Sequence, residues 1–151
     1  MPLVRIDLRR GKPAAYRRAV AAAVHQALVS EVGIPDDDRF QIVAEHDADG
    51  LIYDPHYMGV ERTDDIVFVH ITFRRGRSPE VRQALHRRIA ENLARDPGVR
   101  AEDVLIVLVE NDPVDWSVGN GEAQLLRFLP PQLPTGPIAA SAMKSPIASP
   151  R

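Results

Sequence analysis

Hydrophobic and polar positions follow two different periods along this chain, and each change of period marks an expected element. Residues 4–8 alternate between apolar and polar side chains, which is the period of a half-buried β-strand. From residue 16 to residue 32 a large side chain recurs at every fourth position, which predicts an amphipathic helix that the Gly-Ile-Pro sequence at 33–35 ends. Residues 39–45 predict a second strand, so the order up to this point is β-α-β.

The same order returns after a polar loop over residues 46–65. Residues 66–73 form a nearly continuous apolar run, which is typical of a strand covered on both faces. Residues 78–93 predict a helix, because a Ser that can cap it is followed by Pro at the first helical position and then by an apolar stripe. Residues 104–110 predict a fourth strand. Strands that alternate with helices of this length predict parallel pairs joined by right-handed crossovers.

The two halves also resemble each other at a constant offset of 65 residues (4 to 69, 33 to 98). Residues 4–12 align with residues 69–77, and the same offset sets Gly33 and Asp38 over Gly98 and Asp103. We therefore predict an α+β fold with a duplicated β-α-β unit, a four-stranded mixed sheet and two helices on one face. A C-terminal hairpin that turns at residues 119–121 and a tail follow it. The other face of the sheet has no cover of its own, which predicts oligomerisation through it.

Length and composition divide the chain into two parts. The 151 residues, 44% of them hydrophobic, suit one folded domain with a sizeable core, which we place at residues 2–128. Residues 129–151 are rich in Pro, Ala and Ser and have no periodicity, so we expect a disordered or draped tail there.

Charge and residue content exclude several classes of function. A formal net charge of −2 provides no basic field for nucleic acid, and the lack of cysteine excludes disulfides and Cys-based zinc sites. The five histidines show no metal-ligand spacing, so we expect neither a metal nor a cofactor. No apolar run approaches the ~18–20 residues that span a bilayer. We therefore predict a cytoplasmic protein without a membrane partner.

Position 2 is a proline, and its small side chain favours removal of Met1, which leaves a free secondary amine. An α-amino group titrates near ~8, close enough to neutrality to act as an acid or a base. The strand that follows at once would hold this amine in place. Pro2 is therefore a candidate catalytic residue, although proline at position 2 is also common in chains without such chemistry.

Arginines gather at residues 74–77, between the third strand and the helix that follows it. If strand geometry continues that far, Arg75 and Arg77 point to the same side. Two guanidiniums beside the positive end of a helix form a receptor for a carboxylate. A solvated basic turn is the alternative, because residues 9–12 repeat the pattern. Asp38 lies where the second expected strand begins. It is either a turn residue or a functional carboxylate that positions a water molecule or holds the Pro2 amine protonated.

Together these residues resemble the tautomerase superfamily, which works with an amino-terminal proline, and within it the malonate semialdehyde decarboxylase branch. The resemblance covers residues 2–126. It is carried by Met1-Pro2-Leu3, residues 32–41, Arg75-Gly76-Arg77-Ser78 and residues 109–119, which contain Asp115-Trp116-Ser117-Val118-Gly119.

The resemblance implies roles for individual residues. Pro2 corresponds to the catalytic amine, Arg75 and Arg77 to the residues that bind the substrate carboxylate, and Asp38 to a polar group that assists. Trp116 corresponds to part of the pocket wall, where Val118 and Leu125 replace aromatic side chains of the decarboxylase. The resemblance also implies a homotrimer.

The implied activity is that of an enzyme acting on a small 3-oxo or unsaturated carboxylate, similar to malonate semialdehyde decarboxylase. A cationic Pro2 would polarise the substrate carbonyl, or the amine would form an iminium, and either provides an electron sink beta to the departing carboxylate. A neutral Pro2 would instead act as a base in keto–enol tautomerism, and a hydratase stays open too. A non-catalytic trimeric binding protein is the alternative from another class.

Overall fold

The computed structural model describes residues 1–128. The chain divides into two compact units, of which the first is Met1–Asp112 and the second begins at Pro113. The expected tail, residues 129–151, lies outside the described residues, and the single domain expected over residues 2–128 stays a prediction.

The first unit begins with the expected β-α-β order. Strand β1 is Pro2–Arg9, helix α1 is Ala14–Ala27 and strand β2 is Gln41–His46. The helix expected over residues 16–32 continues from α1 into η1 (Leu28–Val32), which is wound as a π-helix. Gly33 follows with a φ of 72°, a left-handed conformation that glycine adopts without steric penalty, so the helix ends there.

The second β-α-β unit follows the same plan. Strand β3 is Val67–Arg74, helix α2 is Pro79–Arg95 and strand β4 is Val104–Asn111. Two short 3₁₀ helices, η2 (Tyr57–Gly59) and η3 (Ala101–Asp103), lie in the connections. Ser78 caps α2, because its Oγ accepts a hydrogen bond from the Val81 N–H at 3.3 Å, and Pro79 is the first helical residue.

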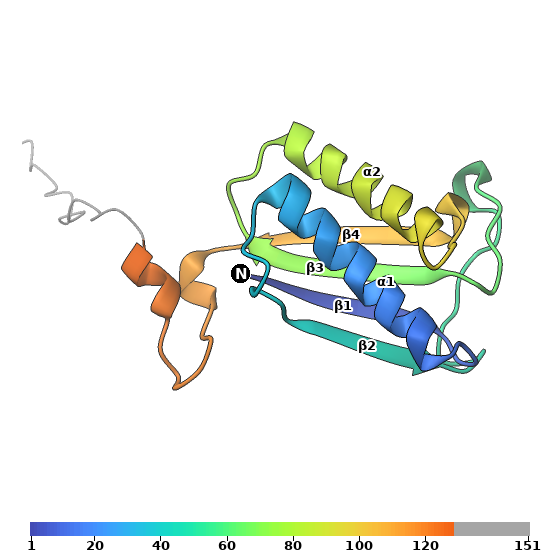
Figure 1. Cartoon of the computed structure of the whole chain (residues 1–151), viewed down its shortest axis with the longest axis horizontal. Helices are drawn as coiled ribbons and strands as arrows, with labels where there is room; N and C mark the ends of the chain where they lie inside the picture. Colours follow the sequence, from blue (N-terminus) through green and yellow to red (C-terminus); the bar gives the residue numbers. More distant parts are fainter. Residues whose placement is uncertain (129–151) are drawn as a thin grey trace, which may run out of the picture. The chain divides into compact units, whose positions relative to one another are not determined.

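The four strands form one mixed sheet with the order β2-β1-β3-β4 (Figure 1). Strands β1 and β2 are parallel, β3 and β4 are parallel, and the central pair β1 and β3 is antiparallel. The predicted α+β fold with a four-stranded mixed sheet is therefore confirmed.

The internal duplication is visible in the strand register. Val4 lies opposite Gln41, and the residues 65 positions later, Val69 and Ile106, lie opposite each other. The turns after β1 and β3 repeat as well, because Gly11 and Gly76 have φ values of 116° and 115°.

Both helices cover the same face of the sheet, as expected (Figure 1). Seven inward-facing side chains of the central strands are at most 2% exposed: Val4, Ile6, Leu8, Val67, Val69, Ile71 and Phe73. Helices α1 and α2 add buried side chains of their own to this core, among them Val24, Leu28, Leu85 and Ile89.

The opposite side of the sheet, here called the outer face, carries apolar side chains that stay accessible. Five of them are between 38% and 46% exposed: Leu3, Ile42, Leu105, Val107 and Val109. His70 of β3 is also exposed, so the expectation that residues 66–73 are covered on both faces is not met within one chain. The reason is that α1 and α2 both pack on the other face.

The second unit, described over residues 113–128, contains the 3₁₀ helices η4 (Pro113–Asp115) and η5 (Gln124–Phe128). The hairpin expected around residues 119–121 is wrong in this detail, because no strand follows β4 within residues 112–128. Gln124 bridges the turn instead, accepting from the Val118 N–H at 3.0 Å and donating to the Gly119 carbonyl at 2.6 Å. Two strands alone are marginally stable, and this short segment holds little apolar alternation to support them.

Candidate active site

The start of β1 lies beside the end of β3, because the two strands are antiparallel. Pro2 lies opposite Phe73 of β3, and Phe73 lies opposite Glu110 of β4. All three residues belong to the rows that face the helices: Pro2 is buried, Phe73 is 1% exposed and Glu110 is half-buried. The sheet therefore brings Pro2 to the strand end that carries the arginine cluster.

Asp38 lies beside the amino group at the start of the chain. Its Oδ2 is 2.7 Å from the Met1 amino nitrogen, and its buried Oδ1 has no hydrogen-bond partner within residues 1–128. Two backbone hydrogen bonds hold this connection: the Asp38 N–H donates to the Pro35 carbonyl at 3.1 Å and the Val4 N–H donates to the Phe40 carbonyl at 3.0 Å. The fold thus sets a carboxylate at the beginning of β1.

His25 of α1 supports the turn that carries Asp38. Its side chain is almost fully buried, and its Nε2 is 2.8 Å from the Asp36 carbonyl oxygen. A carbonyl oxygen only accepts hydrogen bonds, so Nε2 carries the proton and donates. The sequence shows a histidine on a helix, but it does not show that this helix faces the turn at residues 35–38.

Arg77 and Arg75 have different surroundings. The Arg77 guanidinium carbon lies 5.1 Å from the centre of the Phe73 ring, and the guanidinium donates a hydrogen bond to the Arg74 carbonyl. Arg75 instead pairs through Nε with Asp112 Oδ1 at 2.7 Å, and its side chain is 61% exposed. Arg75 and Arg77 were expected to point to the same side if strand geometry continued as far as residue 77, but β3 ends at Arg74.

Arg77 is the more buried of these two cations. Burial lowers the pKa of Arg77, the neighbouring Arg74 lowers it further, and the Glu110 carboxylate acts in the opposite direction. Arginine nevertheless keeps its charge at neutral pH. Arg77 forms no ion pair with a carboxylate of residues 1–128, so its guanidinium can receive an anionic ligand.

The three residues expected to wall the pocket all lie in the second unit. Trp116 is 9% exposed, Val118 is 46% exposed and Leu125 is half-buried. The Trp116 N–H donates to the Pro113 carbonyl at 3.4 Å. Their contribution to a pocket around Pro2 stays a prediction.

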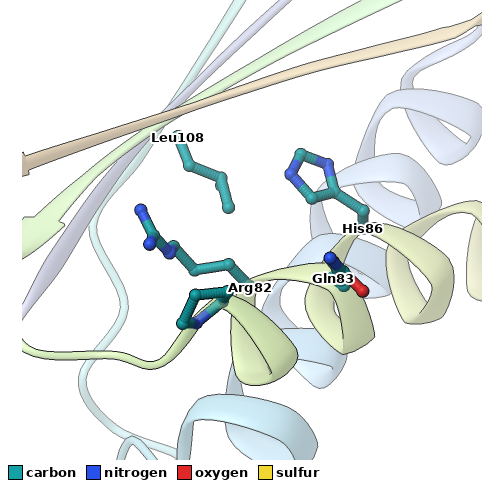
Figure 2. A pocket seen from close by; sticks show the side chains of 5 residues that line it. Arg82, Gln83, His86 and Leu108 are labelled. Atoms are coloured by element: carbon teal, nitrogen blue, oxygen red, sulfur yellow. The ribbon is translucent and has the colours of Figure 1, made fainter.

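A groove of about 300 Å³ lies between α2 and β4 (Figure 2). It is lined by Pro79, Arg82, Gln83, His86 and Leu108. A second groove of about 270 Å³ is lined by Ala14, Arg17, Arg18, Ala21 and Val43, which are the residues 65 positions earlier. Because the duplication repeats the groove position by position, we attribute it to the β-α-β unit and not to a site specific to one half.

Pro2, Asp38 and Arg77 together provide an amine position, a carboxylate and a guanidinium at one end of the sheet. Such a set can bind a small carboxylate and transfer a proton to or from it. Among residues 1–128, no group of three or more His, Asp or Glu side chains is arranged to hold a metal ion, and no helix is long and apolar enough to cross a membrane. Glu110 is the neighbour that sequence reasoning missed, although the offset of 65 aligns it with another glutamate, Glu45.

Comparison with known proteins agrees with this geometry. Two family models, each described as tautomerase enzyme, match residues 38–119 and residues 2–61. The chain is 40% identical over 126 residues to the probable tautomerase YusQ of Bacillus subtilis (strain 168), which covers 83% of this chain and 99% of that protein.

Solved structures show the same fold. The crystal structure of FG41 malonate semialdehyde decarboxylase inhibited by 3-bromopropiolate has a TM-score of 0.78 and 41% identity, and the match covers 83% of this chain and 95% of that one. A fused 4-OT wild-type symmetric trimer has a TM-score of 0.68 over 82% of this chain and 98% of that one. At 23% identity the second likeness concerns the fold alone.

Proposed function

Because this chain belongs to the tautomerase superfamily, in its malonate semialdehyde decarboxylase-like branch, we propose that it is a decarboxylase of small 3-oxo acids that uses Pro2 as its catalytic amine. The observation that carries the proposal is the 2.7 Å ion pair between the chain's amino group and Asp38. Removal of Met1 moves the free amino group by one residue, to the Pro2 nitrogen, at the strand end where Arg77 lies.

Pro2 would act on the substrate carbonyl. As a cation it donates a hydrogen bond to the carbonyl oxygen; as a free amine it adds to the carbonyl carbon, and loss of water gives an iminium. The bond between C2 and the carboxylate carbon then breaks, its electron pair moves toward the polarised carbonyl or iminium, and carbon dioxide leaves. Protonation of C2, and hydrolysis of the iminium where one formed, completes the turnover. Asp38 would pair with the cation, since its carboxylate lies 2.7 Å from the amino group at the start of the chain.

The substrate carboxylate would be bound by the arginines after β3. Arg77 supports this role best, since it lies over Phe73, whose neighbour across the sheet is Pro2. Arg75 would join it by exchanging Asp112 for the substrate, as its single contact through Nε leaves other donors of the guanidinium to a ligand.

The runner-up reactions use the same residues. A neutral Pro2 would move a proton between carbon and oxygen in keto–enol tautomerism, and the description of YusQ as a probable tautomerase favours keeping this reaction. Hydration of an unsaturated acid is the third candidate. Release of carbon dioxide distinguishes decarboxylation from the other two reactions. A pH–rate profile then identifies the form of the amine that acts, because base chemistry and iminium formation both require the activity to rise as the amine deprotonates.

We propose a homotrimer as the assembly. Its support is the apolar outer face, which neither helix covers, and the symmetric trimer formed by the fused 4-OT of the same fold. We also propose a cytoplasmic location, which the absence of cysteine fits.

The test begins with the intact mass of the purified protein, which should lack Met1. Malonate semialdehyde and other 3-oxo acids should release carbon dioxide, and Pro2→Ala and Arg77→Ala should each reduce kcat/KM by about 10²-fold or more. Lys12→Ala is the matched control for Arg77→Ala, because Lys12 is the counterpart of Arg77 in the first half and should leave turnover unchanged. Full activity of Pro2→Ala, or of a protein that keeps Met1, would show chemistry that does not use the Pro2 amine, and a wild type that turns over no such acid would favour the non-catalytic trimer.

A further inference from the structure

Glu110 lies at the Pro2 end of the sheet and acts on two arginines, Arg82 and Arg77. Its Oε2 is 3.9 Å from Arg82 Nη1 of α2, and on its other side lies Phe73, over which Arg77 is stacked. Its Oε1 is buried and accepts no hydrogen bond from any of residues 1–128. Buried carboxylate oxygens are nearly always paired, so this one calls for an explanation.

The internal duplication supplies a reference for this pair. The residues 65 positions earlier, Glu45 and Arg17, form the same contact from β2 to α1, with Arg17 Nη1 at 2.9 Å from Glu45 Oε1. The pair of Glu110 and Arg82 is longer by 1.0 Å (3.9 minus 2.9). The same pair of residue types on the same scaffold is thus in hydrogen-bond distance in the first half and further apart in the second.

The difference between the halves lies in the third cation. The counterpart of Arg77 is Lys12, whose amino group pairs with Asp65 and stands 5.0 Å from the Tyr16 ring centre. Arg77 has no carboxylate of its own among residues 1–128, and Glu110 is the acidic group that acts on it. Glu110 therefore acts electrostatically on both Arg82 and Arg77, although it forms no ion pair with Arg77.

Arg77 needs such a counter-charge to stay where it is. Its guanidinium is half-buried and close to Arg74, and both burial and a like charge favour its movement into water. The contact with Phe73 and the hydrogen bond to the Arg74 carbonyl oppose this movement and keep the Arg77 guanidinium over the ring.

We propose that Glu110 is a positioning residue of the active site: it attracts the Arg77 guanidinium onto the Phe73 ring, in line with Pro2, and so keeps the carboxylate receptor assembled. This inference rests on the proposed function for its catalytic consequence. Glu110 itself does not touch the substrate, because Phe73 and its strand lie between Glu110 and Pro2.

The first experiment is a kinetic comparison of Glu110→Gln with Glu45→Gln, its counterpart in the first half. Glu110→Gln should raise KM for a 3-oxo acid at least tenfold while kcat changes less than threefold, and Glu110→Asp should recover part of the loss. Glu45→Gln should keep the wild-type KM. An unchanged or lower KM in Glu110→Gln overturns the inference, since a lower KM means that Glu110 only repels the anion.

The second experiment does not depend on activity. Phenylglyoxal modifies accessible arginines, and peptide mass mapping gives the rate at each position. Arg77 should react several-fold faster in Glu110→Gln than in the wild type, relative to Arg75, and Glu45→Gln should leave the ratio unchanged. If the wild type turns over no 3-oxo acid but this ratio changes, the proposed function fails and the positioning of Arg77 stands; an unchanged ratio overturns the positioning.

Discussion

Asp38 and Asp103 occupy equivalent positions in the two halves of the chain. The carboxylate of each contacts a backbone nitrogen just before the adjacent strand, which is β1 for Asp38 and β3 for Asp103. Asp38 Oδ2 is 2.7 Å from the Met1 amino nitrogen, whereas Asp103 accepts the Thr63 N–H at 2.6 Å and the Thr63 hydroxyl at 2.9 Å. In the second half the chain continues through this point and closes the contact. In the first half the acceptor meets an amine, so one duplicated position serves structure and the other can serve chemistry.

Asp38→Asn should change how the Pro2 amine reacts without unfolding the protein. Asparagine keeps the size of the side chain but removes the negative charge that lies 2.7 Å from the amino group at the start of the chain. The rate of alkylation at Pro2, followed by intact mass at one fixed pH, should therefore be higher than in the wild type. An unchanged rate would show that Asp38 does not act on the amine.

Asp103→Ala should instead lower the free energy of unfolding, by about 3 kcal/mol. The substitution removes a fully buried carboxylate and with it the acceptor of two Thr63 hydrogen bonds. Denaturant unfolding measures it. Activity per folded molecule should stay at the wild-type level, which contrasts with Asp38→Asn. Equal loss of activity in both variants would argue against the division of roles.

His25→Leu should destabilise the turn before β2 by about 1 kcal/mol, because the Asp36 carbonyl loses the hydrogen bond that the buried His25 side chain donates. Amide hydrogen exchange over residues 35–40 should rise locally. His25→Gln keeps an N–H donor and serves as the matched control, with a smaller effect expected. Identical behaviour of the two variants would show that packing, and not the hydrogen bond, is what His25 contributes.

Val107→Asp should prevent assembly, since it puts a charge between Leu105 and Val109, the apolar side chains that β4 adds to the outer face. Light scattering coupled to size exclusion should show a species of one chain in place of three. Ile52→Asp is the control, because Ile52 is 80% exposed in the loop before β3 and lies outside the strands of that face. If Val107→Asp still forms a trimer, the interface between the chains does not include this part of the outer face.

Acid sensitivity should depend on Asp7 of the outer face. Burial raises the pKa of Asp7, but hydrogen bonds from Arg5 and His46 outweigh it, so the pKa is lower in the folded chain. A lowered carboxylate pKa adds stability above the unfolded value of about 3.9, and this is lost as the pH falls through the folded value. Asp7→Asn should therefore show a smaller loss of unfolding free energy between pH 5 and pH 2; an equal loss would contradict this assignment.

Local sequence was a good guide to the elements. The strand at residues 4–8, the helix stop at Gly33 and the cap at Ser78 depend on side-chain period and backbone preference over a few residues. The hairpin at residues 119–121 failed for the opposite reason. Its glycines mark a turn, but a turn forms a hairpin only where two strands find support.

The sequence by itself determined the duplicated β-α-β order, the uncovered sheet face and the presence of a proline, an aspartate and an arginine cluster at element ends, because period and turn chemistry are local properties. Only the tertiary structure decided that Pro2 lies in one row with Phe73 and Glu110, since that row depends on antiparallel pairing between strands about 70 residues apart. It also decided that Arg77 and not Arg75 stacks on Phe73, because β3 ends at Arg74 and the side-chain alternation ends with it.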